Sequence, residues 1–109
     1  NNMLIQNEIV GVLESVPNPQ TSEKGQMWQE ILIRQKAPTD NAGIPRGDDK
    51  IFPIMIFGKE TIEKVWTACK EVPMGGAVVC KVYLNSNART NESKTYYNIQ
   101  LKLKDMRPL

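Results

Sequence analysis

Aromatic rings and cations are the side chains of this chain whose types and positions could do chemistry. A flat ring can stack on another flat ring, and a lysine or arginine can pair with a negative charge. Four segments that alternate between apolar and polar residues carry such groups at the positions facing away from the expected core. These groups are Trp28, Arg34, Phe57, Lys59, Lys81, Tyr83 and Tyr96, and a polar segment nearby adds Arg89 and Lys94.

Groups for catalysis or metal binding are scarce. The chain contains no histidine, which removes the commonest general base and metal ligand. Its two cysteines, Cys69 and Cys80, do not have metal-site spacing. The adjacent carboxylates Asp48 and Asp49 are flanked by Arg46 and Lys50, as expected for a solvated loop. We therefore expect no enzyme activity, no metal and no small-molecule cofactor.

Charge is distributed unevenly along the 109 residues, although the formal net charge is only +2. Residues 1–76 carry eight Lys and Arg against ten Asp and Glu, whereas residues 77–109 carry six against two. The last third therefore produces a local positive field. No apolar run approaches the ~20 residues of a membrane span, and no signal peptide is visible. Together with two unpaired thiols, these features predict a cytoplasmic protein.

The pattern predicts the order strand, strand, strand, helix, strand, strand. The strands fall at residues 4–16, 27–35, 51–57, 77–85 and 96–104, and the helix at 60–71. Polar segments at 36–50 and 85–95 read as long loops. Gly11, inside the first strand, indicates a bulge or a tight bend, as at a barrel corner.

The segment from Ile51 to Phe57 is apolar on both faces. Phe52, Ile54 and Ile56 share the face expected to enter the core, which leaves Ile51, Met55 and Phe57 on a second surface. Pro53 cannot donate to a ladder, so one side of this strand should be an edge or a bulge.

The predicted helix carries one apolar stripe, and the last strand alternates regularly. Spacing of i, i+3, i+4 and i+7 assigns the helix stripe to the core, including Trp66. In the last strand Tyr97, Ile99, Leu101 and Leu103 are expected to face inward. The helix stripe comprises Ile62, Val65, Trp66 and Cys69.

These elements favour an all-β fold: one domain over residues 1–109, a small five-stranded barrel with a helix between its third and fourth strands. This is the pattern of the oligonucleotide/oligosaccharide-binding fold, or OB-fold, whose helix would plug one end of the barrel. A mixed α+β sheet covered by one helix is the alternative.

The chain resembles bacterial single-stranded DNA-binding proteins of the OB-fold. The resemblance rests on Ile-Met-Ile-Phe-Gly-Lys at 54–59, the helix that follows, Gly-Gly-Ala-Val-Val-Cys-Lys-Val-Tyr-Leu at 75–84, and Tyr-Tyr-Asn-Ile-Gln-Leu at 96–101. It departs from the family in lacking the glycine-rich linker and acidic tail, and in beginning its third strand with Ile-Phe-Pro. A tail-less primosomal or mobile-element relative, acting in DNA replication or recombination, fits equally well.

The resemblance implies binding of single-stranded DNA with little sequence preference, by base stacking and contacts to the backbone. The residues expected to make these contacts are those that lie outside the predicted core, on the strands or on the polar segment that follows the fourth strand: Trp28, Arg34, Phe57, Lys59, Lys81, Tyr83, Arg89, Lys94 and Tyr96. The apolar Ile51 and Met55 better suit a homo-oligomer interface, in a dimer or tetramer. The alternatives are a protein-interaction or oligomerisation module, or a binder of RNA or oligosaccharide on the same face.

Overall fold

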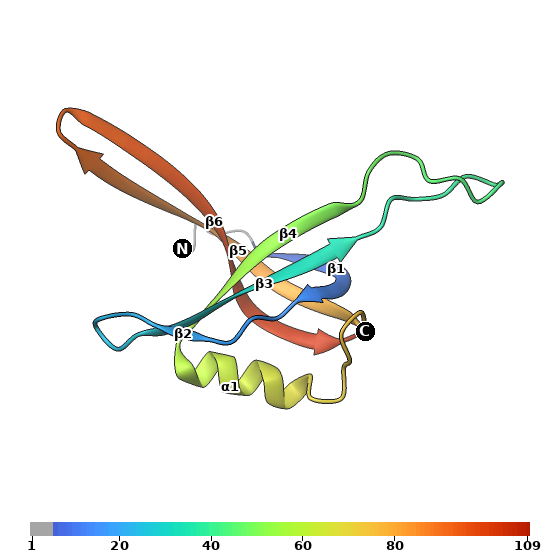
Figure 1. Ribbon diagram of the computed structural model, residues 1–109, viewed down its shortest axis with the longest axis horizontal. Helices are drawn as coiled ribbons and strands as arrows, with labels where there is room; N and C mark the ends of the chain where they lie inside the picture. Colours follow the sequence, from blue (N-terminus) through green and yellow to red (C-terminus); the bar gives the residue numbers. More distant parts are fainter. Residues whose placement is uncertain (1–5) are drawn as a thin grey trace.

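A curved sheet that closes on itself forms the body of the protein (Figure 1). The computed structural model describes residues 6–109. Neighbouring strands follow the order β1-β5-β6-β4-β3-β2, and additional pairing of β1 with β3 closes the ring. Among the strands that the structure describes, only β4 and β6 pair in parallel. The strands are β1 (Gln6–Ser15), β2 (Gln20–Thr21), β3 (Met27–Gln35), β4 (Lys50–Phe57), β5 (Ala77–Asn91) and β6 (Lys94–Pro108).

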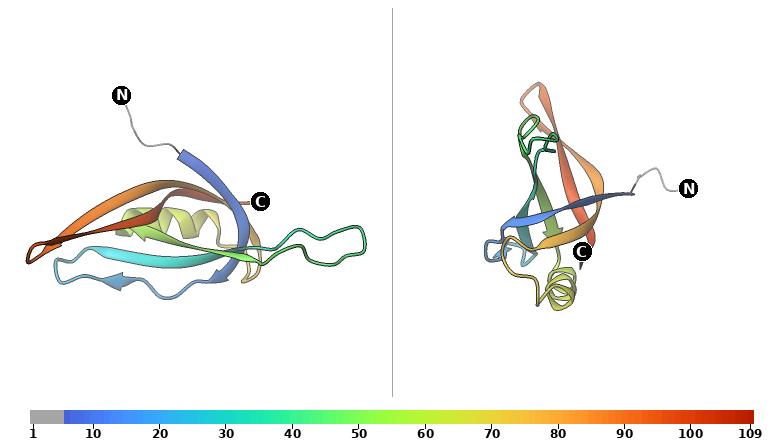
Figure 2. Two further views of the ribbon diagram at one scale, coloured as in Figure 1. Left: turned by 90° about the horizontal axis from the view of Figure 1, so that it is seen from above. Right: turned by 90° about the vertical axis from the view of Figure 1, so that its right-hand side faces the viewer.

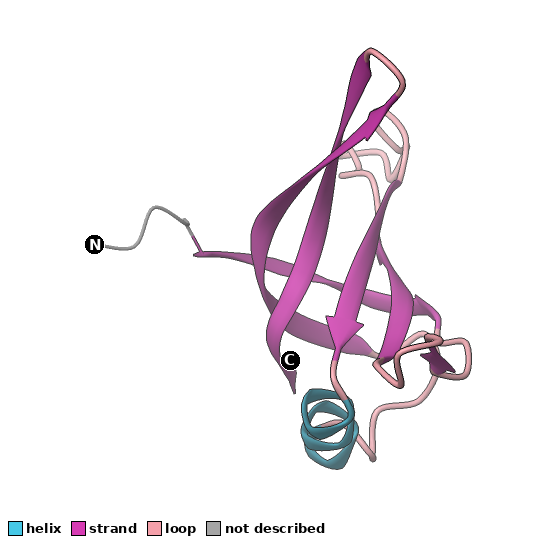
Figure 3. Cartoon of the chain, turned by 90° about the vertical axis from the view of Figure 1, so that its left-hand side faces the viewer, coloured by secondary structure: helices cyan, strands magenta, loops and turns pink. Residues whose placement is uncertain are grey.

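The helix α1 (Lys59–Ala68) lies between β4 and β5 in the chain and packs against one end of the sheet (Figure 3). It begins after Gly58, whose φ of 93° suits glycine, and its buried stripe includes Ile62 and Val65. The helix ends before the predicted residue 71, and Pro73 follows the turn at its end. This arrangement confirms the predicted OB-fold with its helix between the third and fourth barrel strands.

Alternate residues of the strands fill the barrel. The side chains of Ile31, Ile33, Ile54 and Ile56 are completely buried, and α1 covers them from below. Buried Gln29 donates to the carbonyl of Pro17 and accepts from the indole N–H of Trp66, both at 2.7 Å. The other core members are Ile9, Leu13, Ile62, Val65, Cys69, Val78, Cys80, Val82, Leu103 and Met106, and the partly buried Trp66 packs against them.

Strand β1 turns a corner at Gly11, as predicted. Up to Val12 its residues pair with β5, and from Val12 onward they pair with β3. A Cβ atom at Gly11 would lie 2.6 Å from both the carbonyl oxygen of Arg34 and a methyl of Ile33. Glycine therefore allows the two backbones to approach closely where the barrel closes. Leu4 and Ile5, the start of the predicted first strand, lie outside the described residues.

The predicted loop at 85–95 is wrong. Strands β5 and β6 instead continue as a long hairpin that extends beyond the barrel and turns at Glu92 and Ser93 (Figure 1). Most of its residues are polar, among them the paired Thr90 and Thr95, whose hydroxyls lie 3.2 Å apart. A run of polar residues is usually interpreted as a loop. A hairpin that extends into solvent does not need an apolar face, because pairing between its two strands can hold it together. We call its segment from 84 to 101 the arm.

The inward assignment of Tyr97 and Ile99 is also wrong. Their side chains are 76% and 69% exposed, and Leu84 on the neighbouring strand is 50% exposed. They keep the same parity as buried Leu103, but they lie on the arm, past the end of the barrel. Parity therefore identifies the face of a strand correctly and cannot show where the core ends.

Two smaller features complete the fold. The edge predicted at Pro53 is confirmed, because β4 begins to pair with β6 only at the next residue, Ile54. The segment 36–49 is a long excursion containing one isolated bridge, Thr39 to Pro45. It rises on the side of the sheet opposite α1, as the arm does (Figures 1 and 2). The two-residue β2 has no counterpart among the predicted strands.

Replacing Gly11 with valine should destabilise the fold by about 1–3 kcal/mol, because overpacking forces two closely packed backbones apart. Urea denaturation followed by tryptophan fluorescence measures the change. The control Ala88→Val adds a similar side chain on the exposed arm and should change stability by less than about 0.5 kcal/mol. Equal stability of the two variants would contradict this account of the barrel corner.

Candidate functional site

Four half-buried side chains form a continuous row across the outer surface of β3, β4, β6 and β5. Trp28 and Phe57 are directly paired across β3 and β4. The ammonium of Lys102 lies 4.4 Å from the centre of the Phe57 ring, and Lys102 is paired in turn with Tyr83. We call these residues the outer row: Trp28, Phe57, Lys102 and Tyr83.

Lys102 stands at the centre of the outer row, although its sequence position alone gives it no special role. It is one of several outward residues of the last predicted strand, where lysines commonly protect sheet edges. The parallel contact of β4 with β6 pairs it with Met55 and brings it next to Phe57. This pairing joins strands about 45 residues apart and leaves no local signal in the sequence.

A second group of aromatic and cationic side chains lies near the tip of the arm. Arg89 and Tyr96 form a cross-strand pair, and the ammonium of Lys94 lies 5.9 Å from the centre of the Tyr96 ring. Arg89 and Tyr96 also line a shallow hollow of about 290 Å³ together with Asn87 and Asn98. We call Arg89, Lys94 and Tyr96 the arm cluster.

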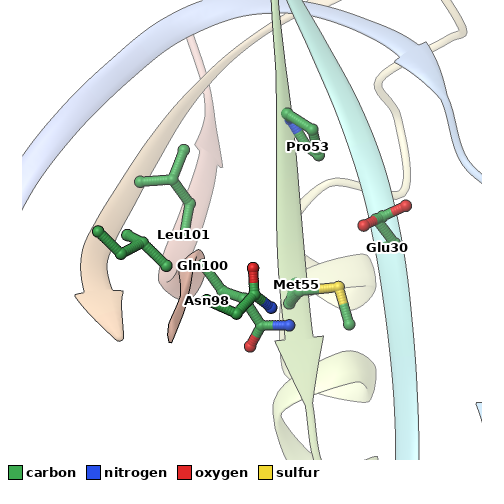
Figure 4. A pocket seen from close by; sticks show the side chains of 7 residues that line it. Glu30, Pro53, Met55, Asn98, Gln100 and Leu101 are labelled. Atoms are coloured by element: carbon green, nitrogen blue, oxygen red, sulfur yellow. The ribbon is translucent and has the colours of Figure 1, made fainter. Parts of the chain in front are cut away.

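A pocket of about 350 Å³ lies between the outer row and the arm cluster (Figure 4). The amides of Asn98 and Gln100 extend from β6 toward Met55, and Glu30 lies on β3 on the other side of Met55. Asn98 also lines the hollow of the arm cluster, so the two openings adjoin. The walls of the pocket are completed by Pro53, Ile99 and Leu101.

Two predicted lysines lie outside these groups but remain accessible. Lys59 is exposed at the first position of α1, two residues after Phe57. Lys81 is exposed on β5, where its register partners are Glu8 on β1 and Asp105 on β6. The acidic neighbours of Lys81 therefore weaken the positive potential around it. Lys59 is only two residues from Phe57, so it lies at the end of the outer row.

Arg34 is engaged within the protein. Its guanidinium donates two hydrogen bonds to Glu14, at 2.7 and 3.0 Å, and one to Asp49 at 3.0 Å. The hydrogen bond from Arg34 lowers the pKa of Glu14, and the backbone N–H of Ala37 together with Arg34 lowers that of Asp49. The ion pairs join β3 to the start of β4 and to β1, which gives Arg34 a structural part in closing the barrel.

The two cysteine thiols lie inside the barrel core. Both cysteines are buried, and burial raises the pKa of the Cys80 thiol to about 12. Within residues 6–109 no three potential metal ligands cluster. No helix of that part of the chain is long and apolar enough to span a bilayer.

Replacing Arg34 with glutamine should destabilise the protein more at neutral pH than in acid. Folding lowers the pKa of Glu14 below its ordinary value of 4.5 and that of Asp49 below its ordinary value of 3.8. Above those ordinary values the two ion pairs therefore contribute fully to the stability of the fold. This contribution is lost as the pH falls through the lowered folded-state values. The gap in urea midpoint between wild type and Arg34→Gln should therefore be widest at about pH 6–7 and shrink below about pH 4.

A matched control for this measurement is Lys64→Gln on the exposed side of α1, since Lys64 forms no ion pair within the described chain. Its effect should be small at both pH values. A gap for Arg34→Gln that stays constant with pH would show that these ion pairs do not stabilise the fold.

Comparison with known proteins places the fold among single-stranded DNA-binding proteins. The wild-type protein of this kind from Thermus aquaticus superposes with a TM-score of 0.65 at 15% identity, over 95% of this chain and 49% of that one. The mitochondrial single-stranded DNA-binding protein of S. cerevisiae superposes with a TM-score of 0.64 at 19% identity, over 97% of this chain and 95% of that one. The chain thus spans about half the length of the Thermus protein. Neither a protein-family model nor a curated protein sequence matches it.

Proposed function

We propose that this protein binds single-stranded DNA with low sequence specificity, by stacking of bases on aromatic rings and by contacts of cations with the phosphate backbone. The observation that carries the proposal is the outer row, an aromatic and cationic strip that crosses the surface of β3 and β4. In OB-folds this strand surface and the adjoining loops are the usual place for oligonucleotides. The likeness in fold to two proteins described as single-stranded DNA-binding supports the same reading.

The outer row and the arm cluster supply complementary contacts. Trp28, Phe57 and Tyr83 have partly exposed side chains, and each stacked base is worth about 1–3 kcal/mol by alanine substitution. Lys102 brings a cation within 4.4 Å of the Phe57 ring, so phosphate and base contacts would alternate over a short distance. The arm cluster then extends the path beyond the barrel.

The roles of the individual residues follow from their surroundings. We assign stacking to Trp28, Phe57, Tyr83 and Tyr96, and backbone contacts to Lys102, Lys59, Arg89 and Lys94, with Lys81 at the margin. Arg34 already satisfies two carboxylates, so its part is structural. Met55 lines the pocket beside the outer row, and for that reason we assign it to the ligand instead of the predicted oligomer interface. Ile51 is 39% exposed, and its part in a dimer or tetramer stays a prediction.

A protein partner is the second candidate function, and the apolar face of the arm favours it. Leu84, Tyr97 and Ile99 share that face and are largely exposed. Large exposed apolar groups side by side mark interaction surfaces more often than single ones do. This face is opposite to that of Tyr96 and Arg89, so the two functions can coexist on one arm.

Binding of an oligo-dT of about 12 nucleotides, followed by quenching of tryptophan fluorescence at low and high salt, tests the proposal. Affinity should fall steeply as the salt concentration rises, because binding releases counterions from the DNA and this release is less favourable in concentrated salt. Trp28→Ala and Phe57→Ala should each weaken binding about 5- to 150-fold. Lys102→Met should weaken it and reduce the slope of log affinity against log salt by about 0.7.

Two adjacent tyrosines provide the matched control. Tyr96→Ala should weaken binding, whereas Tyr97→Ala, on the opposite face of the same strand, should leave it unchanged. No binding at about 50 mM salt, where phosphate contacts are strong, would exclude the proposed function. A loss with Tyr97→Ala alone would point to the apolar face of the arm as the working surface.

A further inference from the structure

The pocket beside the outer row arises where two strands separate. Within the described chain β4 and β6 pair only at Ile54 with Leu101 and at Met55 with Lys102. On the arm side of these pairs the strands diverge and leave the pocket of about 350 Å³ between them. A volume of this order lies at the lower end of the range for small-molecule sites, about 300–1,000 Å³, which is ample for a single base.

The lining of the pocket suits a flat heterocycle with polar edges. Pro53, Met55 and Leu101 provide apolar contact, and a methionine sulfur interacts favourably with aromatic rings. The amides of Asn98 and Gln100 supply donors and acceptors from one side (Figure 4). Asn87 already donates to the Gln100 oxygen at 3.3 Å, which leaves the Gln100 NH₂ group available as a donor.

Glu30 is the informative residue of this lining. It is the one carboxylate of the pocket, it is exposed, and it forms no ion pair within residues 6–109. It lies next to Trp28 and Phe57, on a surface proposed to receive a polyanion. A carboxylate there opposes phosphate groups, but it can accept a hydrogen bond from the exocyclic amine of a base.

We infer that the pocket takes one unstacked base that carries an exocyclic amine, with Glu30 as the acceptor. Cytosine presents an amine at its 4-position, as a donor, where uracil and thymine present a carbonyl that a carboxylate repels. The inference rests on the proposed function and adds to it a base preference at one position of an otherwise tolerant site. Glu30 is thus a specificity-determining residue rather than a source of affinity.

Comparison of an oligo-dC with an oligo-dU of equal length, about 12 nucleotides, at pH 7.5 isolates this contact. The two probes lack the thymine methyl and differ only at the Watson–Crick edge of the base. The wild type should bind the dC probe about tenfold more tightly, the value of one good hydrogen-bonded base contact. Glu30→Gln should bring the ratio close to one, since an amide can pair with either edge.

Controls separate this inference from the function it rests on. Glu63→Gln on exposed α1 removes the same charge away from the pocket and should leave the dC to dU ratio at its wild-type value. If Glu30→Gln tightens both probes equally and the ratio does not move, Glu30 acts only by repulsion and the inference is wrong. A wild-type ratio of one also overturns it while leaving the proposed function intact. If neither probe binds at about 50 mM salt, the proposed function fails, and the inference with it.

Discussion

The short parallel contact between β4 and β6 is the constraint on which the candidate site depends. It consists of two register pairs, Ile54 with Leu101 and Met55 with Lys102, and it joins β4 to β6 within the ring of strands. The residues of each pair are far apart in the sequence. On one side of the contact Lys102 comes to lie over the Phe57 ring. On the other side the strands part, and the pocket opens. If β4 and β6 paired over more residues, their backbones would occupy the space of the pocket. If they did not pair at all, the Lys102 ammonium would not lie over the Phe57 ring.

Closure of the barrel also decides which charges are available to a ligand. Arg34 is drawn into ion pairs with Glu14 and Asp49 near the place where β1 passes from β5 to β3, and Gly11 permits that passage. Its positive charge is used to hold strands together. Lys102 and the arm cluster lie beyond this region, with aromatic rings as their neighbours. Except for Lys59, the cations that we propose to contact phosphate therefore belong to the basic last third of the chain.

Local patterns in the sequence were sufficient to predict the order of the main elements, the core parity of β3 and β4, the bend at Gly11 and the edge at Pro53. These features depend on alternation, helical spacing and backbone restrictions, all of which are written in neighbouring residues. The arm was missed because its polar pairs resemble a loop, and Tyr97 and Ile99 were misplaced because parity continues past the end of the core. The position of Lys102 and the pocket around Glu30 depend on pairing between distant strands, which no local pattern reveals.

The engagement of Arg34 illustrates the same limit at the level of a single side chain. Its outward position on β3 was predicted correctly, yet its partners come from β1 and from the segment before β4. An outward cation in a sequence is therefore a candidate for ligand binding only until its neighbours are known. In contrast, Trp28 and Phe57 were predicted on one outer surface and are directly paired there.

The most direct test of the central claim is a map of amide chemical shifts in ¹⁵N-labelled protein as a short single-stranded DNA is added. The account predicts that the largest changes follow the outer row and the arm cluster, on β3, β4, β6 and the arm. Residues of α1 beyond its first turn, from Glu63 to Ala68, should change little. Changes concentrated on β1 or on Glu63–Ala68 of α1, with none at Phe57 or Lys102, would contradict the account.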